Sequence, residues 1–441
     1  MRAAVVGAGV AGLTTAYRLS QAGWKVAVYE RDAELGGLAS TFEFDGVRPE
    51  RYYHFICRPD RPYLELIDEL GLAPKLHWQP TRMGYSYEGR YYRFGTPWSL
   101  LRFSPLSFAS RVRFGLHALD SKRMTGWADL DEVTARDWLI EHEGRQVYDV
   151  VWRPLLELKF GDEADSISAA WIWARINRVA NSREGVLMRE WLGYLEGGTQ
   201  ALIDALAGRI EAAGGSVRAD SAVERILIAD GRVTGVRLGS GVEEPADVVV
   251  STVAPSQLLG MAPELPEPFA TTLREVGYYG VACWLLVASE PLSPDFWLNV
   301  HDSRVSFPGV IQYTNLNPMP ELGGRHLLYI PYYMSVTDPR FAMGKEEWQP
   351  TLRAEIDALH PGFSEKVESW QLFRDTHAQP LFRAGFHRRF SWLEQPGTPV
   401  GGLFRTDMSQ TYPDDRSLVN AIAKANAIAD AVARDSGSAG T

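Results

Sequence analysis

The stretch that decides the fold reads AAVVGAGVAG at residues 3–12 and KVAVYE at residues 25–30. The two apolar runs predict short β-strands, and the segment between them has a helical pattern that ends at Gly23. A strand, a glycine-rich turn, a helix and a second strand that ends in an acid form the first unit of a doubly wound α/β sheet. These residues therefore predict a Rossmann-type domain at the start of the chain.

The glycines of this turn are spaced as G-x-G-x-x-G. Gly7 allows the tight turn, Gly9 lets a pyrophosphate approach the backbone, and Gly12 lets the helix pack closely on the strand. The first turn of the helix, which includes Ala11, offers free N–H groups and a partial positive charge to phosphates. Glu30 is placed to accept hydrogen bonds from a ribose. Together these residues predict a dinucleotide site.

A second glycine pair follows Glu30, in the stretch RDAELGGLAS at residues 31–40. Gly-Gly is a common loop dipeptide, so an ordinary turn is the alternative. The stretch resembles the E-x(5)-GG pattern of FAD-containing enzymes in the amine oxidase, phytoene desaturase and protoporphyrinogen oxidase superfamily. The resemblance implies FAD as the cofactor. It also implies further cofactor-binding residues, namely Arg31, Gly36, Gly37, Leu38 and Ala39.

The bulk composition argues against several classes of function. The 441 residues are 45% hydrophobic and 23% charged, and a net charge of −10 argues against a nucleic-acid partner. The histidines show no paired ligand spacing, so no metal site is predicted. No apolar run approaches the ~18 residues of a membrane span, and no signal-peptide pattern precedes the first strand, so we expect no integral membrane segment. With Cys57 and Cys283 as the only cysteines, we expect no disulfide framework and a cytoplasmic location.

Two later segments resemble further FAD-binding pieces of the same superfamily. The first follows LEGGTQAL at residues 195–202 and contains a strand–turn–strand whose start, near Val223, would contact the adenine. The second is the strand at residues 402–407, which ends at Asp407, followed by an Ala-rich helix. In the superfamily this acid bonds the ribityl chain and the helix N-terminus points at the flavin. Here Thr406 precedes the acid, where the family usually has glycine.

The resemblance implies an α/β fold: a Rossmann-type, GR2-like FAD-binding domain with an inserted α+β substrate domain. The FAD-binding domain is expected to be discontinuous, with pieces at residues 1–80, 195–275 and 396–435. Residues 81–194, which have helical patterns, and residues 276–395, which are rich in strands, would form the substrate domain. Residues 436–441 read as a flexible tail.

The first catalytic candidates are Tyr53 and His54, in a segment that related proteins bring beneath the flavin. A histidine could move a proton or bond the flavin at neutral pH. The alternative is a hydrogen-bonded core histidine beside packed tyrosines. Lys159 is a further candidate, because it ends a helix in the string PLLELKFG, which resembles a poorly characterised bacterial branch of flavin oxidoreductases. Ordinary complementarity to the helix dipole explains a lysine there equally well.

Polar residues at predicted strand ends are candidates for substrate binding. They suit a pocket that orients a small oxygenated molecule, and they suit hydrogen-bonded loops equally well. The residues are Glu50, Tyr313, Asn315, Tyr332 and Gln379.

Basic and aromatic residues alternate over residues 98–114, where Arg102, Arg111 and Arg113 lie among Trp98, Phe108 and others. A solvated helix face is the simplest interpretation. A membrane-surface helix and an entry for an anionic substrate are the alternatives.

The leading hypothesis is an FAD-dependent oxidoreductase that takes a hydride from a small or medium-sized organic substrate to flavin N5. A redox-neutral enzyme resembling UDP-galactopyranose mutase is the second. A non-catalytic carrier on a related fold is the third, and the retained glycines and Glu30 argue against it. A homodimer is compatible with the sequence.

Overall fold

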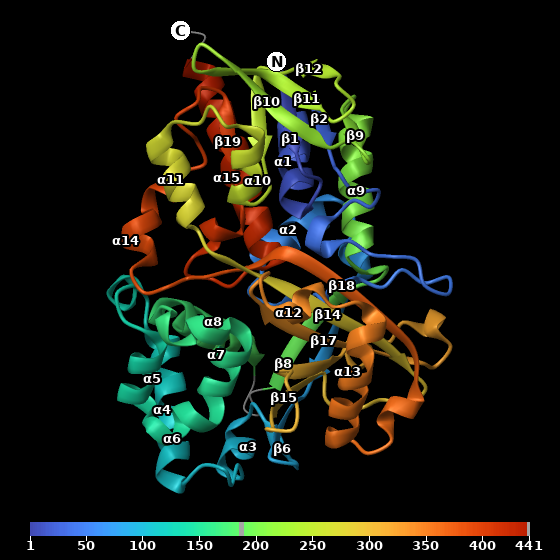
Figure 1. Cartoon of the computed structure of the whole chain (residues 1–441), viewed down its shortest axis with the longest axis vertical. Helices are drawn as coiled ribbons and strands as arrows, with labels where there is room; N and C mark the ends of the chain where they lie inside the picture. Colours follow the sequence, from blue (N-terminus) through green and yellow to red (C-terminus); the bar gives the residue numbers. More distant parts are fainter. Residues whose placement is uncertain (185–188, 439–441) are drawn as a thin grey trace.

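One end of the molecule is built on a five-stranded parallel sheet (Figure 1). The computed structural model describes residues 1–184 and 189–438. The strand order is β19-β13-β1-β2-β9, and each neighbouring pair is parallel. The strands are β1 (Arg2–Val6), β2 (Lys25–Tyr29), β9 (Ser216–Arg218), β13 (Val248–Ser251) and β19 (Leu403–Arg405). Segments that lie far apart in the sequence therefore share one sheet.

Three helices cover one face of this sheet: α1 (Val10–Gln21), α9 (Gly198–Ala212) and α15 (Leu418–Ser438). Helix α1 contacts both of the others. Leu13, Leu202 and Ile428, one from each helix, are fully buried in a core shared with β1 and β2. Strands of a parallel sheet are buried on both faces, which explains why residues 3–6 of β1 and 248–250 of β13 are all apolar.

A three-stranded antiparallel sheet covers the other face. It contains β10 (Val223–Ala229), β11 (Arg232–Leu238) and β12 (Glu243–Pro245). Asp230 and Gly231, with φ of 49° and 74°, form the turn of the expected hairpin. Ile226 and Val236 are fully buried against Val249 of the parallel sheet. Helices α10 (Pro255–Met261) and α11 (Glu267–Glu275) follow β13.

The other end of the molecule contains a seven-stranded sheet in the order β18-β14-β17-β16-β15-β5-β6. All neighbours are antiparallel except β15 and β5. Trp284 of the sheet packs against Trp348 of helix α13 (Lys345–Leu359) on one face. The strands are β5 (Met83–Tyr87), β6 (Arg90–Phe94), β14 (Tyr278–Ala288), β15 (Trp297–His301), β16 (Gly309–Gln312), β17 (His326–Met334) and β18 (Val367–Pro380).

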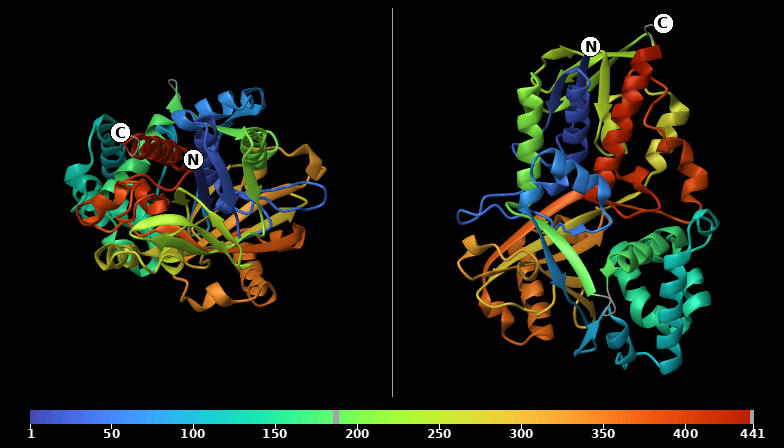
Figure 2. Two further views of the ribbon diagram at one scale, coloured as in Figure 1. Left: turned by 90° about the horizontal axis from the view of Figure 1, so that it is seen from above. Right: turned by 180° about the vertical axis from the view of Figure 1, so that it is seen from behind.

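A helical lobe lies beside this sheet, below the parallel sheet (Figures 1 and 2). It contains α3 (Pro97–Leu101), α4 (Phe108–Arg123), α5 (Ala135–Glu143), α6 (Arg145–Val147), α7 (Arg153–Phe160) and α8 (Ala169–Asn181). Helices α2 (Arg61–Glu69), α12 (Pro339–Ala342) and α14 (Phe386–Phe390) are the remaining α-helices of the described residues. The predicted fold class, a Rossmann-like sheet with an α+β insertion, is confirmed.

Strands also run between the two ends. β8 (Arg189–Leu195) pairs with β4 (Leu76–Thr81), with β3 (Ile56–Cys57) and with β7 (Arg183–Glu184). Strands β4 and β8 therefore reach across the domain limits expected near residues 80 and 195, and the division at those limits stays a prediction.

Some global features bear on function. In the described part of the chain, no helix combines the length and the hydropathy needed to cross a membrane. Cys57 and Cys283 are buried and form no disulfide. Within the same residues, no three His, Cys, Asp or Glu side chains group in a way that could hold a metal ion.

Candidate active site

A cavity of about 1980 Å³ connects the parallel sheet with the seven-stranded sheet. At one end it is lined by the glycine turn after β1, and at the other by Trp297 of β15 and by α4. Small-ligand pockets usually measure about 300–1,000 Å³, so this cavity has room for more than one such ligand. It begins at the carboxyl ends of the parallel strands, where α/β sheets bind their ligands.

The turn between β1 and α1 has the backbone geometry that its glycines predict. Gly7 has a φ of 98°, and a Cβ atom on Gly12 would lie 2.0 Å from the Gly7 carbonyl oxygen. Helix α1 starts after Gly9, and no side chain caps its N-terminus. Its first N–H groups are therefore available to an anion, and Gly9 and Ala11 line the cavity beside them. This cradle fits a pyrophosphate.

The second glycine pair lies directly against this turn. Gly36 forms a β-bridge with Gly9, and its N–H donates to the carbonyl oxygen of Ala8 at 2.9 Å. A Cβ atom on Gly37 would lie 3.4 Å from the Gly9 Cα. The chain then continues along the cavity wall through Leu38 and Ala39. The two glycine motifs thus form one wall of the cavity. The Gly36–Gly37 pair is part of this wall and not only an ordinary loop turn.

Glu30 is buried beside the glycine turn. Its Oε2 accepts the N–H of Ala8 at 2.8 Å, and its Oε1 accepts the N–H of Asp32 at 3.1 Å. A carboxylate has about four lone-pair positions, so both oxygens can still accept a ribose hydroxyl. Arg31 lies at the cavity edge and is exposed, with Asp32 3.7 Å away. Across the cavity, Val223 begins β10 and lines the wall.

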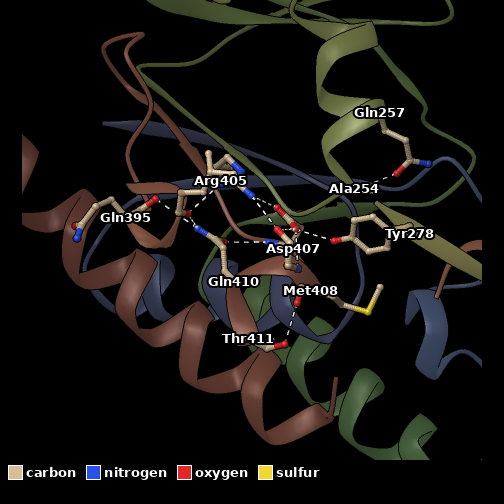
Figure 3. A network of polar contacts seen from close by, with 11 residues as sticks. Ala254, Gln257, Tyr278, Gln395, Arg405, Asp407, Met408, Gln410 and Thr411 are labelled. Atoms are coloured by element: carbon tan, nitrogen blue, oxygen red, sulfur yellow. Dashed lines mark hydrogen bonds and ion pairs between the residues drawn. The ribbon is translucent and has the colours of Figure 1, made fainter. Parts of the chain in front are cut away.

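Asp407 lines the cavity and is the centre of a network of polar contacts (Figure 3). Its Oδ1 accepts the Tyr278 hydroxyl at 2.8 Å and both the N–H and hydroxyl of Ser409, at 2.8 and 2.5 Å. Its Oδ2 pairs with the guanidinium of Arg405. Although burial opposes ionisation, Arg405 and Ser409 lower the pKa of Asp407. The carboxylate is thus oriented by protein donors and caps the 3-10 helix Met408–Thr411, while Oδ2, with Arg405 as its one partner, can still accept a hydroxyl.

Helix α15 begins at the cavity. Ser417, Leu418 and Val419 line the wall, so the positive end of the helix dipole faces the enclosed space. A bound group that gains negative charge would be stabilised there.

Tyr53 and His54 both line the cavity, whereas Glu50 lies behind them. His54 Nδ1 lies 2.9 Å from Glu50 Oε2, and Glu50 Oε1 accepts the N–H of Thr199 at 2.9 Å. Glu50 therefore orients the imidazole and fixes it to the start of α9. The Tyr53 ring packs edge-on against Trp297, with 5.6 Å between centroids. Burial raises the pKa of the Tyr53 phenol, so the hydroxyl is neutral at physiological pH.

Lys159 belongs to a buried cluster of charges in the same cavity. Its Nζ lies 2.6 Å from Asp415 Oδ2, and Nη1 of Arg175 lies 3.3 Å from the same oxygen. Arg416 donates its backbone N–H to Asp415 Oδ1 and its guanidinium to the hydroxyl of Tyr333. We call Lys159, Arg175, Asp415 and Arg416 the cationic cluster.

The cationic cluster carries more positive than negative charge. Burial, reinforced by the two arginines, lowers the pKa of Lys159 to about 7. Burial opposes ionisation of Asp415, but Lys159 and Arg175 hold its pKa well below the usual range. Burial raises the pKa of the neighbouring Asp414, which weakens any compensation from that side. Among the described residues, Nε of Arg416 has no hydrogen-bond partner. An anionic group would be attracted to this part of the cavity.

None of the five predicted substrate contacts lines the cavity, and Glu50 lies behind His54. Asn315 donates to the carbonyl oxygens of Ser293 and Asp295, at 2.9 and 2.8 Å, and orders a loop. Tyr313 and Gln379 are buried in the interior. Tyr332 donates its hydroxyl to Glu355 at 2.9 Å, because alternate residues of β17 face opposite sides of the sheet. Its neighbour Tyr333 lines the cavity instead.

The sequence interpretation missed Arg175, Asp415 and Arg416 as parts of a site. Arg175 lies in the apolar helix pattern AAWIWARINR, where a lone arginine looks like a solvated residue. Asp415 and Arg416 lie in QTYPDDR at residues 410–416, a string that resembles the same bacterial branch as PLLELKFG and whose composition predicts a loop. No pattern in the local sequence indicates that α7, α8 and this loop contact one another.

Sequence comparison relates the chain to desaturases and oxidases. It is 26% identical to the 15-cis-phytoene desaturase of Synechococcus elongatus over 291 residues, which are 60% of this chain and 60% of that protein. It is 30% identical to a neurosporene-forming phytoene desaturase of Rhodobacter capsulatus over 281 residues, 57% and 52% of the two chains. It is 29% identical over 177 residues to a mitochondrial protoporphyrinogen oxidase of Nicotiana tabacum, 38% and 34% of the chains. The chain thus spans about one-third to three-fifths of these relatives.

Structure comparison shows the same fold over nearly the whole chain. A putative protoporphyrinogen oxidase from an Exiguobacterium species matches 98% of both chains, with a TM-score of 0.76 and 16% identity. A reduced UDP-galactopyranose mutase has a TM-score of 0.75 and 17% identity, over 98% of this chain and 95% of that one. Putrescine oxidase bound to putrescine has a TM-score of 0.72 and 20% identity, over 98% and 99%.

A family model described as flavin containing amine oxidoreductase matches residues 10–407. This match covers Gly12, the Gly36–Gly37 pair, both insertions and β19, and it confirms the resemblance to the family. The chain belongs to the flavin-containing amine oxidoreductase family.

Proposed function

We propose that this protein is an FAD-dependent oxidoreductase that takes a hydride from a small or medium-sized organic substrate. The observation that carries the proposal is the continuity of the cavity, which joins the pyrophosphate cradle, the N-terminus of α15 and a wall of apolar side chains. FAD supplies the hydride acceptor when it is bound. The protein's part is to bind and orient both molecules and to exclude water.

The residues that would hold FAD follow from the geometry. Gly9 and the Gly36–Gly37 pair offer close backbone approach to the pyrophosphate, and Glu30 accepts from the ribose. Val223 would contact the adenine, and α15 would stabilise charge at the flavin ring. Asp407 lines the cavity and would accept a ribityl hydroxyl at Oδ2, and it also holds the 3-10 helix that leads to α15.

His54 is the side chain we assign to proton handling. Glu50 binds its Nδ1 and so fixes the imidazole orientation, while the ring lines the cavity. With Nδ1 bound to Glu50, Nε2 is the ring nitrogen left to take or give a proton. Tyr53, neutral and buried beside it, shapes the cavity wall.

The cofactor assignment is tested by the absorption spectrum of the purified protein, before and after addition of FAD. A flavin band near about 450 nm is expected. Glu30→Ala should weaken FAD binding about 10–100-fold, as expected for a lost hydrogen bond to a charged group. A wild-type affinity in that variant would mean that Glu30 does not hold the ribose, and a protein that takes up no flavin would overturn the proposal.

The electron acceptor is tested by photoreduction under nitrogen followed by readmission of air. Reoxidation within seconds, with peroxide formed, would identify an oxidase, and amines and alcohols would be the substrates to screen. Reoxidation over many minutes would identify a dehydrogenase with another acceptor.

A second candidate function is a redox-neutral sugar-nucleotide mutase. The cationic cluster favours it, because an excess of buried positive charge suits a diphosphate. The test is incubation of nucleotide sugars with the oxidised and the dithionite-reduced protein. Isomerisation by the reduced form alone would favour this candidate, and turnover of neither form would remove it.

We also propose a cytoplasmic location for the protein. Two buried, unpaired cysteines suit a reducing compartment such as the cytoplasm. A homodimer stays a prediction, which sedimentation of the purified protein tests.

A further inference from the structure

Large apolar side chains are exposed in one short segment of the helical lobe. Six of them lie on α3 and α4, and their exposed fractions run from 41% to 69%. In the rest of the described chain, the exposed large apolar side chains are scattered singly, for example Val336 and Trp392. We call the six residues the α3–α4 surface: Trp98, Leu101, Phe108, Val112, Leu116 and Leu119.

Helix α4 is oriented opposite to an ordinary surface helix. Phe108, Val112, Leu116 and Leu119 follow one another at intervals of four, four and three residues, so they form one exposed stripe. The buried side of the helix carries polar groups: His117 Nδ1 lies 2.7 Å from Glu143 Oε1. A surface helix normally buries its apolar stripe and exposes its polar one. The described residues therefore leave the apolar stripe of α4 exposed.

The charge of this segment indicates what kind of partner. Residues 97–124 contain five basic residues and one acidic residue, in a chain with a net charge of −10. Arg102 and Arg113 are exposed beside the stripe. Basic residues around exposed tryptophan and phenylalanine are typical of segments that lie on anionic lipid headgroups. A second copy of the chain would present the same basic face, and the two faces would repel.

The α3–α4 surface also surrounds an opening of the cavity. Leu101, Val112, Leu116 and Leu119 are exposed and line the cavity at the same time. Trp98 and Phe108, with exposed fractions of 64% and 69%, are not among the lining residues. In Figure 1, α3 lies at the end of the molecule opposite the termini. Contact at this surface would bring the opening against the acyl chains.

We propose that the α3–α4 surface docks on an anionic phospholipid bilayer, so that the cavity opens toward the lipid. Trp98 and Phe108 enter the interfacial layer, and the arginines contact the headgroups. A lipophilic substrate could then reach the cavity without crossing bulk water. The docking rests on the surface alone, so it stands or falls independently of the proposed reaction.

The test is flotation of the full chain with vesicles of phosphatidylglycerol and phosphatidylcholine, and with vesicles of phosphatidylcholine alone. Binding to the anionic vesicles is expected, with less binding at high salt. The variant Trp98→Ser/Phe108→Ser should lose at least about tenfold in binding. The control Trp392→Ser/Val336→Ser removes side chains that are 43% and 46% exposed elsewhere, and it should bind like the wild type.

A charge variant separates the contribution of the arginines to vesicle binding from that of Trp98 and Phe108. Arg102→Gln/Arg113→Gln should bind the anionic vesicles several-fold less tightly and reduce the difference between the two kinds of vesicle, because it removes two of the five basic residues of the segment. Thermal unfolding and flavin content check that each variant is folded. Failure of the wild type to float with anionic vesicles would overturn the proposal. So would equal binding by the two serine variants, or a dimer that Trp98→Ser/Phe108→Ser abolishes.

Discussion

The two ends of the cavity are built in different ways. At the parallel sheet, the cradle is made by the backbone of two nearby stretches, in which Gly9 and Gly36 touch. At the seven-stranded sheet, the cationic cluster is made by side chains from α7, α8 and the loop before α15. A backbone that must turn tightly or approach closely needs glycine, so it leaves a pattern in the sequence. Side chains that meet over long distances leave none.

We expect the largest loss of stability and of cofactor binding when a side chain is added at the closest backbone contact of the cradle, between Gly12 and Gly7. In Gly12→Ala the new Cβ would lie 2.0 Å from the Gly7 carbonyl oxygen, so the backbone must move. We expect a loss of about 4 kcal/mol in the free energy of unfolding, with loss of bound flavin. Chemical denaturation and flavin content measure both effects.

Gly208→Ala is the matched control for this change. Gly208 lies in α9, and no atom lies within 4 Å of a Cβ placed there. We expect a gain of about 0.5–1 kcal/mol, because alanine favours the helix. Equal effects of the two alanines would refute the close-approach explanation.

The cationic cluster should be the next most sensitive place. Asp415→Asn removes the only carboxylate that Lys159 and Arg175 share in the described structure. The cost should be about 3 kcal/mol in the free energy of unfolding, because the remaining charges stay largely buried. Glu267→Gln, which breaks an exposed pair with Arg274, should leave the free energy of unfolding almost unchanged. A small cost for Asp415→Asn would show that the cluster is screened by water.

Binding of an anion at the cluster should depend on pH. The pKa of Lys159 is lowered from 10.5 to about 7, whereas the pKa of Arg416 is raised and that of Asp415 is held well below its usual range, so both of these stay charged. The ammonium form binds an anion, so affinity should be highest below pH 7 and fall several-fold as the pH rises above 7. Calorimetric titration with sulfate, whose charge is constant in this range, measures it. Lys159→Met should abolish the pH dependence, and a flat wild-type profile would contradict the assignment.

The smallest contrast concerns two neighbouring tyrosines on β17. Tyr332→Phe removes the hydrogen bond to Glu355 and should cost about 1 kcal/mol of stability, with bound flavin and anion affinity unchanged. Tyr333→Phe removes the partner of Arg416 in the cavity and should change anion affinity more than stability. Paired melting curves and titrations decide between them. The opposite result would mean that Tyr332, and not Tyr333, faces the cavity.

These contrasts show what could be predicted. The strand–turn–helix at residues 2–21 and the position of Glu30 followed from the sequence, because each depends on neighbours in the chain. The sequence indicated Asp407 as a cofactor contact but did not indicate its partners Arg405 and Tyr278. An acid that matches a family pattern does not reveal which side chains surround it.

On the substrate side, residue type was a poor guide. Polar residues at strand ends looked like substrate contacts, but Asn315 ties a loop and Tyr332 faces the wrong side of its sheet. The face a strand residue occupies depends on pairing with distant strands, which no local pattern encodes. The placing of Lys159 in the cavity likewise depends on the packing of α7 against β17.

The interleaving of the two ends has a consequence for synthesis of the protein. Strand β5 pairs with β15, and β1 pairs with β13, so neither pairing can form until the later strand has been synthesised. Strand β19 and helix α15 are synthesised last. Pairings between distant segments form slowly, and unpaired strand edges are prone to aggregate in the meantime. Because α15 completes the cavity wall, an incomplete or truncated chain has no finished cofactor site. Cofactor uptake would therefore mark the molecules whose synthesis and folding are complete.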